Sequence, residues 1–144
     1  MKAFGRLYQR LDSTTSINLK VKALVQYFEK TPPQDAAWGL NLLLGKHQRR
    51  IVTSRMLRDA FLRSFPDFPE WLLEESYGHV GDTGETVSLL LESRGICPNE
   101  SQHSVSLSSW MEDRISKLSG KEDQQRAEKI FEWWSSLTVD ECYL

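Results

Sequence analysis

The chain of 144 residues carries 18 Lys or Arg against 20 Asp or Glu, and 40% of its residues are hydrophobic. This length fits one domain, and no apolar run approaches the roughly 20 residues that a membrane span needs. The N-terminus lacks the apolar core of a signal peptide, so we expect a cytoplasmic protein that binds no membrane. Cys97 and Cys142 stand far apart without a C-x-x-C pair, which favours neither a disulfide framework nor a metal site.

Charge is divided unevenly along the sequence. Residues 1–63 contain twelve Lys or Arg against four Asp or Glu, a balance of +8, whereas residues 64–144 contain six against sixteen, a balance of −10. The first part is therefore a candidate surface for a polyanion, unless folding interleaves the two parts and cancels their fields.

The apolar period is helical almost throughout, starting with a first helix over about residues 3–11. The next helix follows a S-T-T-S cap signal, and its predicted buried stripe consists of Ile17, Val21, Leu24, Val25 and Phe28. Pro32 and Pro33 open a third helix that ends near Gly45. Apolar residues surround this third helix, which predicts a central place in the core.

Six further helices are predicted after a basic connection at 46–53. Thr53 or Ser54 caps the fourth, and the others cover about 70–77, 83–91, 106–118, 121–137 and a last turn capped by Thr138. No repeat and no alternating strand pattern is present, so we predict an all-α, compact single-domain bundle of eight or nine short helices over residues 1–144. The last turn is cut short, which suggests that the chain is one piece of a longer polypeptide.

The basic connection and the helix after it form the first candidate site. Six cations lie between residues 46 and 63, against the single acid Asp59. Arg55 and Arg58 share one helix face, and N–H groups near Ser54 add to the attraction for a phosphate backbone. The alternative is a solvated basic face that aids solubility. No aromatic residues are interleaved, so the expected target is a duplex rather than a single strand.

The second candidate site is the run W-L-L-E-E-S-Y-G-H-V-G-D-T-G-E at residues 71–85. Gly81 and Gly84 flank Asp82 and Thr83 where a helix begins. A glycine-rich helix start lets another backbone approach free N–H groups, which is how helix N-termini hold phosphates. The alternative is a capped turn in which Asp82 is the N-cap and has only a structural role.

No catalytic signature is present. His47, His79 and His103 are scattered, and no nucleophile motif, phosphate loop or H-E-x-x-H occurs. Lys121 opens a K-E-D-Q run that lacks the glycine of a nucleotidyl-transfer motif. The tryptophans fit inward helical positions, and Trp133, beside its main stripe, is a candidate for packing against a neighbour.

Several ordered segments together resemble the N-terminal DNA-binding domain of bacterial ATP-dependent DNA ligases. They are M-K-A-F-G-R-L-Y-Q-R-L-D, A-A-W-G-L-N-L-L-L-G-K, R-I-V-T-S-R-M-L-R and P-E-W-L-L-E-E-S-Y-G-H-V-G-D-T-G-E-T, and the resemblance covers almost the whole chain. It implies an all-helical domain that grips nicked double-stranded DNA without sequence preference, through the backbone and the minor groove. The adenylation and OB-fold domains of the same polypeptide would be its partners.

Carried onto this sequence, the resemblance and the charge pattern give one set of candidate DNA contacts: Lys46, Arg49, Arg50, Thr53, Ser54, Arg55, Arg58, Gly81, Thr83 and Gly84. Thr83 stands where the family usually has an aliphatic residue, so it either packs inward or offers a hydroxyl to a phosphate.

The catalytic lysine motif and the metal-binding carboxylates of the ligase core are absent, so we expect this chain alone to be no enzyme and to hold no cofactor. The resemblance implies ATP and Mg²⁺ for the full-length ligase, a monomer, and work in DNA repair, recombination or replication. The alternative is a helical protein-interaction module without DNA binding.

Overall fold

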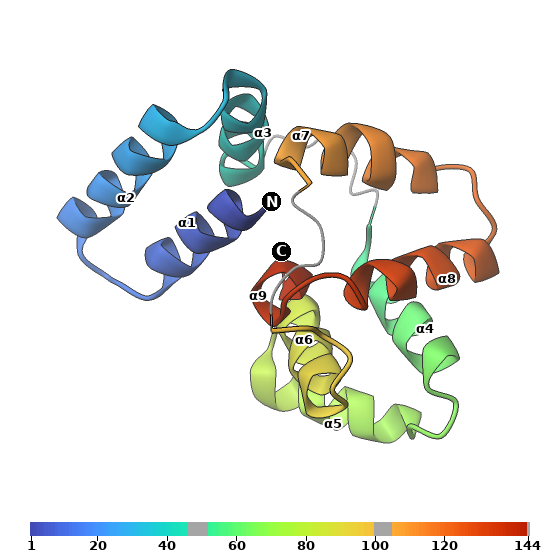
Figure 1. Cartoon of the computed structure of the whole chain (residues 1–144). Helices are drawn as coiled ribbons and strands as arrows, with labels where there is room; N and C mark the ends of the chain where they lie inside the picture. The colour runs from blue at the N-terminus through green and yellow to red at the C-terminus, as the bar shows by residue number, and fades with distance from the viewer. Residues whose placement is uncertain (46–51, 100–104, 144) are drawn as a thin grey trace. The chain divides into compact units, whose positions relative to one another are not determined.

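In the computed structural model, the described residues are 1–45, 52–99 and 105–143, and every regular element among them is a helix (Figure 1). The all-α prediction is therefore confirmed. The α-helices are α1 Lys2–Asp12, α2 Ile17–Lys30, α3 Pro33–Leu43, α4 Ser54–Ser64, α5 Glu70–Val80, α6 Thr83–Ser93, α7 Leu107–Ser109, α8 Asp123–Trp134 and α9 Val139–Tyr143. After α7 the helix continues as a π-helical segment η1 (Trp110–Ile115) and a 3-10 turn η2 (Ser116–Leu118). None of the helices described is long and apolar enough to cross a membrane.

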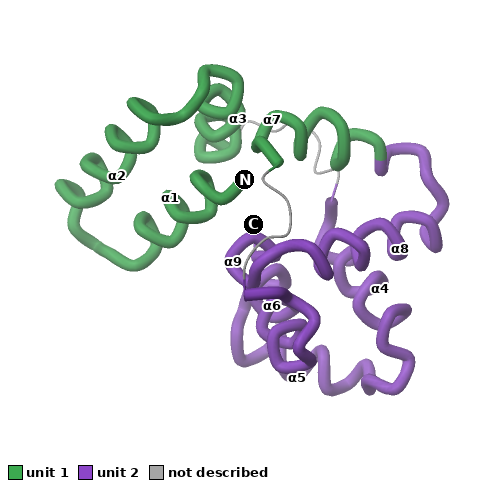
Figure 2. Tube along the Cα trace, in the orientation of Figure 1, with its two compact units in different colours: residues 1–50, 104–117 green, residues 51–103, 118–144 purple. Residues whose placement is uncertain are grey.

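The chain is organised in two compact units (Figure 2). Each unit has its own hydrophobic cluster. Unit 1 comprises residues 1–50 and 104–117, and unit 2 comprises residues 51–103 and 118–144. Unit 1 carries eleven Lys or Arg against five Asp or Glu, a balance of +6, and unit 2 carries seven against fifteen, a balance of −8. Folding therefore sorts the charge asymmetry of the sequence between the units rather than mixing it within each.

The core of unit 1 lies between α1, α2 and the start of α7. Its buried residues are Phe4, Leu7, Ala23, Tyr27, Leu107 and Met111. The predicted stripe of α2 is largely wrong: Leu24 packs against this cluster, but Ile17, Val21 and Val25 are 77%, 52% and 49% exposed. The helix instead turns small Ala23 and amphipathic Tyr27 inward, where the Tyr27 hydroxyl donates to the Asp35 carbonyl oxygen at 3.2 Å.

Helix α3 is not central to the core, contrary to the prediction. Gly39 is its one buried residue among those described, whereas Leu40 and Leu44 are exposed. A Cβ at Gly39 would lie 2.6 Å from the Tyr27 hydroxyl oxygen. The missing side chain therefore lets α3 approach the tyrosine of α2 closely.

Asp35 of α3 joins this helix to the start of α7. Its carboxylate accepts hydrogen bonds from the Leu107 N–H at 3.1 Å, the Ser108 N–H at 2.9 Å and the Ser108 hydroxyl at 2.7 Å. Burial acts to raise the pKa of Asp35, but the bonds from Ser108 and Leu107 outweigh it and lower that pKa below its usual value. Ser106 adds an N-cap, accepting from the Ser109 N–H at 3.1 Å.

The core of unit 2 forms where α8 packs against α4. Ala60 and Phe61 are 0% exposed, and Ala127, Ile130 and Trp134 of α8 belong to the same cluster, as the sequence predicts. Leu91 of α6 is also 0% exposed within it, while Trp133 packs half-buried against its edge. Trp71, by contrast, is 64% exposed, so its predicted inward position is wrong.

The two cysteines, expected to be unrelated thiols, lie together in unit 2. Cys97 follows α6 and Cys142 lies in α9, and their Sγ atoms are 3.6 Å apart although both are free. A hydrogen bond with Cys142 lowers the pKa of Cys97, and the same bond together with burial raises the pKa of Cys142. The contact therefore connects the segment after α6 to α9. The two cysteines are 45 residues apart in the sequence, so the short-range motifs that reveal paired cysteines could not predict it.

Replacement of Leu91 by Ala is expected to lower the free energy of unfolding by about 2–5 kcal/mol, because it leaves a cavity in the cluster of unit 2. Leu89→Ala on the same helix is the control, since Leu89 is 45% exposed and its truncation should cost below about 1 kcal/mol. Urea denaturation followed by circular dichroism measures both. Equal losses for the two variants would contradict the assignment of Leu91 to the core.

Candidate nucleic-acid interface

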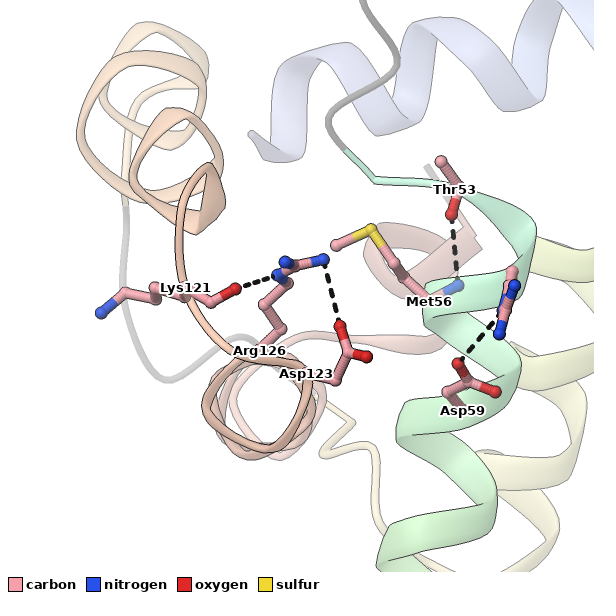
Figure 3. A network of polar contacts seen from close by, with 7 residues as sticks. Thr53, Met56, Asp59, Lys121, Asp123 and Arg126 are labelled. Atoms are coloured by element: carbon pink, nitrogen blue, oxygen red, sulfur yellow. Dashed lines mark hydrogen bonds and ion pairs between the residues drawn. The ribbon is translucent and has the colours of Figure 1, made fainter.

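The first candidate surface begins at the N-terminus of α4. Thr53 is the N-cap, and its hydroxyl oxygen accepts from the Met56 N–H at 3.2 Å (Figure 3). Of the two caps that the sequence allows, the structure therefore has Thr53, and Ser54 is the exposed first residue of the helix. The predicted contacts Lys46, Arg49 and Arg50 lie outside the described residues.

Arg55 and Arg58 have different surroundings although both were predicted to face the same ligand. The Arg55 side chain is 90% exposed and lies 3.7 Å from the Asp59 carboxylate one turn later. Such an exposed pair adds at most about 1 kcal/mol, so Arg55 can exchange Asp59 for a phosphate at little cost. Arg58 is 28% exposed and is paired with Glu74 of α5. It therefore connects α4 to α5 within the unit.

In the second candidate surface, Gly81 and Asp82 have clear local roles. Gly81 ends α5 in the left-handed conformation, with φ of 85°, and its N–H donates to the Tyr77 carbonyl at 2.7 Å. Asp82 is the N-cap of α6, because its Oδ1 accepts from the Glu85 N–H at 2.9 Å. The capped turn offered as the alternative reading is thus present in the structure.

Thr83 packs inward, since it is 8% exposed. Gly84 is half-buried, and a Cβ built on it would lie 2.9 Å from the Tyr143 carbonyl oxygen of α9. The close backbone approach that the glycine permits is therefore made by the chain itself. A DNA contact at Gly81, Thr83 or Gly84 stays a prediction. The structure also gives each of these residues a role within the chain, which the sequence did not show.

Helix α9, which packs against α6, has a cap of its own at Thr138. The Thr138 N–H and hydroxyl both donate to Glu141 Oε2 at 3.2 Å, and the Glu141 N–H donates to the Thr138 carbonyl at 3.0 Å. The Glu141 carboxylate reaches back to the Thr138 N–H as in a capping box, whereas the Thr138 hydroxyl donates to that carboxylate rather than accepting from the Glu141 N–H. The predicted cap at Thr138 is confirmed.

The described part of the first candidate surface, at the start of α4, and the second candidate surface lie in unit 2, whose balance of charge is acidic. Glu74, Glu75 and Glu85 are exposed on α5 and α6. Within the described residues, no three His, Cys, Asp or Glu side chains gather closely enough to hold a metal ion. The exposed cations of α1 and α2 in unit 1 were left out of the predicted contacts. The sequence signalled them through the basic balance of residues 1–63, within which individual contacts were predicted only for residues 46–58.

A comparison with protein families decides the class of this chain. The family model described as DNA ligase N terminus matches residues 1–143. The chain belongs to this family. It is an N-terminal domain of an ATP-dependent DNA ligase, as the ordered sequence segments indicated. The match spans both units, so the groups that this ligase domain uses can come from either of them.

Replacement of Gly84 by Ala is expected to destabilise the ligase domain by about 1–3 kcal/mol, because the new methyl group would press on the Tyr143 carbonyl. The matched control is Gly78→Ala inside α5, where a Cβ meets no atom within 4 Å. Gly78→Ala should raise the free energy of unfolding by about 0.5–1 kcal/mol, because alanine favours the helical conformation more than glycine does. Thermal or urea unfolding measures both, and a Gly84→Ala variant as stable as Gly78→Ala would show that α9 does not restrict this position.

Proposed function

We propose that this chain binds nicked double-stranded DNA, independently of sequence, as the DNA-gripping domain of an ATP-dependent DNA ligase. The observation that carries the proposal is the family match over residues 1–143. Contacts go to the phosphates and to the minor groove on both sides of the nick. They hold the duplex so that the adenylation and OB-fold domains of the same polypeptide meet the nick in a reactive geometry.

The exposed start of α4 supports this proposal in physical terms. Arg55 presents a planar guanidinium, which can donate two parallel hydrogen bonds to two oxygens of a phosphate group. It lies at the N-terminal turn of a helix, whose partial positive charge also favours an anion. Ser54 adds an exposed hydroxyl at the same turn. Lys46, Arg49 and Arg50 precede this turn in the sequence and extend the proposed contact.

The domain contributes affinity and position rather than chemistry. The sequence holds no nucleotidyl-transfer lysine motif, so ATP and Mg²⁺ are assigned to the rest of the ligase. The proposed setting is a monomer in the bacterial cytoplasm that works in repair, recombination or replication.

A protein-interaction function is the second candidate, and one observation favours it. Helix α2 exposes Ile17, Val21 and Val25, and α5 exposes Trp71. Exposed apolar groups of this kind often mark protein contacts. This candidate predicts binding that is insensitive to salt, whereas phosphate binding weakens steeply as salt rises.

The isolated chain is expected to bind a fluorescein-labelled nicked duplex with an affinity that falls steeply between 50 and 200 mM salt, by roughly tenfold or more. Fluorescence anisotropy gives this curve. Arg55→Glu should weaken binding for every DNA sequence alike, whereas Lys129→Glu on α8, which removes a Lys129–Glu132 pair, is the control with an unchanged affinity. Absence of salt-sensitive binding would overturn the proposal, and an unaffected Arg55→Glu variant would remove α4 from it.

Incubation of this chain with α-labelled ATP and Mg²⁺ is expected to give no covalent adenylate, because no lysine stands in the required motif. Denaturing gel electrophoresis detects the label. A full-length ATP-dependent ligase under the same conditions is the positive control. A labelled band from this chain would show that it carries the nucleotidyl-transfer chemistry itself.

A further inference from the structure

A groove runs between α1 and α2 in unit 1, outside all the contacts assigned so far. Its volume is about 220 Å³, and both helices contribute cations to its lining: Arg6 and Arg10 from α1 and Lys30 from α2. All three residues are exposed. The groove lies wholly within one compact unit, so its shape depends on that unit alone.

The charge of this groove is uncompensated. No Asp or Glu belongs to its lining. None of the ion pairs within the described residues includes Arg6, Arg10 or Lys30. Arg6 and Arg10 are one helical turn apart, a spacing at which like charges destabilise a helix. An anion in the groove would relieve this repulsion.

The donors of the groove are arranged for an oxyanion. Arg10 Nη1 donates to Gln26 Oε1 at 2.8 Å, which holds that guanidinium at the groove wall and leaves its other N–H groups available. Arg6 supplies a second guanidinium and Lys30 an ammonium. Two guanidinium groups and one ammonium offer more hydrogen-bond donors than the two oxygens of a single carboxylate can accept, so they match a phosphate group better.

The floor of the groove is apolar. Leu7, Ala23 and Tyr27 line it and are 3%, 2% and 7% exposed, because they also belong to the core of unit 1. An apolar floor below a cationic rim suits a ligand with a carbon face and an anionic edge. The deoxyribose and phosphate of a DNA backbone have this combination, whereas inorganic phosphate would leave the floor uncovered.

We propose that the groove between α1 and α2 binds a phosphodiester of the DNA backbone, with the sugar on its apolar floor. This inference rests on the proposed function, since DNA is the polyanion that a ligase domain meets. It adds a contact in the basic unit 1, with its balance of +6, to those proposed at the start of α4 in unit 2. An acidic protein segment is the competing occupant that the experiment tests.

The experiment compares Arg6→Gln/Lys30→Gln with Lys20→Gln/Lys22→Gln in the whole chain. Both variants remove two positive charges from unit 1, and Lys20 and Lys22 lie on α2 outside the groove lining. Affinity for a labelled nicked duplex is measured by anisotropy over a range of salt concentrations, and circular dichroism verifies that each variant is folded. The groove variant should bind about tenfold more weakly than the control, with a salt slope reduced by about 1 for each lost phosphate contact.

A second readout follows the Gln26 side-chain amide by NMR. Its signal should shift on addition of nicked duplex to the wild-type chain, and poly-L-glutamate or inorganic phosphate at the same concentration should leave it in place. An equal loss of affinity in both variants, or an unchanged affinity in the groove variant, would overturn the proposed role of the groove while leaving the proposed DNA binding of the chain intact. Failure of the wild-type chain to bind duplex would overturn the proposed function itself. A shift produced by poly-L-glutamate but not by DNA would assign the groove to an acidic protein segment.

Discussion

Unit 2 depends on the packing of α8 against α4. These helices come from distant parts of the sequence, and burying Ala60 and Phe61 against Ala127, Ile130 and Trp134 closes the core between them. This fixes the rotation of α4, so that Arg55 is left in solvent while Arg58 turns to Glu74. Since α9 follows α8 in the chain, the same packing positions the helix that covers the start of α6. One hydrophobic contact thus shapes both candidate surfaces.

A glycine at a helix start can be required by a positive φ or by the close approach of another backbone. In the structure the first explanation applies to Gly81 and the second to Gly84. Gly81 is needed for a positive φ, with open space where a side chain would be. Gly84 is needed because the Tyr143 carbonyl comes close. A sequence shows that a backbone can approach but not which one does. The approach by α9 leaves Gly81, where a Cβ would meet no atom within 4 Å, as the more open of the two glycines.

Sequence reasoning worked where the information was local. Caps at Thr53, Asp82 and Thr138 and the inward face of α8 follow from short-range periodicity and hydrogen bonding, and all are present. It was wrong for the stripe of α2 and for Trp71, because periodicity tells that one face is apolar but not whether a partner covers it. The ion pair of Arg58, the contact of Cys97 with Cys142 and the role of Gly84 all depend on tertiary neighbours, which no spacing in the sequence encodes.

Charge explains why contacts in both units are compatible with binding one polyanion. At physiological ionic strength a charge is screened beyond about 8 Å, so the balance of −8 in unit 2 does not prevent a phosphate from meeting Arg55 at close range. The same screening limits the attraction exerted by the excess of cations in unit 1, which therefore reaches further at low salt. Under the proposed function, short-range hydrogen bonds from the start of α4 and from the groove of α1 and α2 would hold the DNA. The affinity would then depend on salt through all the phosphate contacts together, so the proposed groove would matter as much as the start of α4.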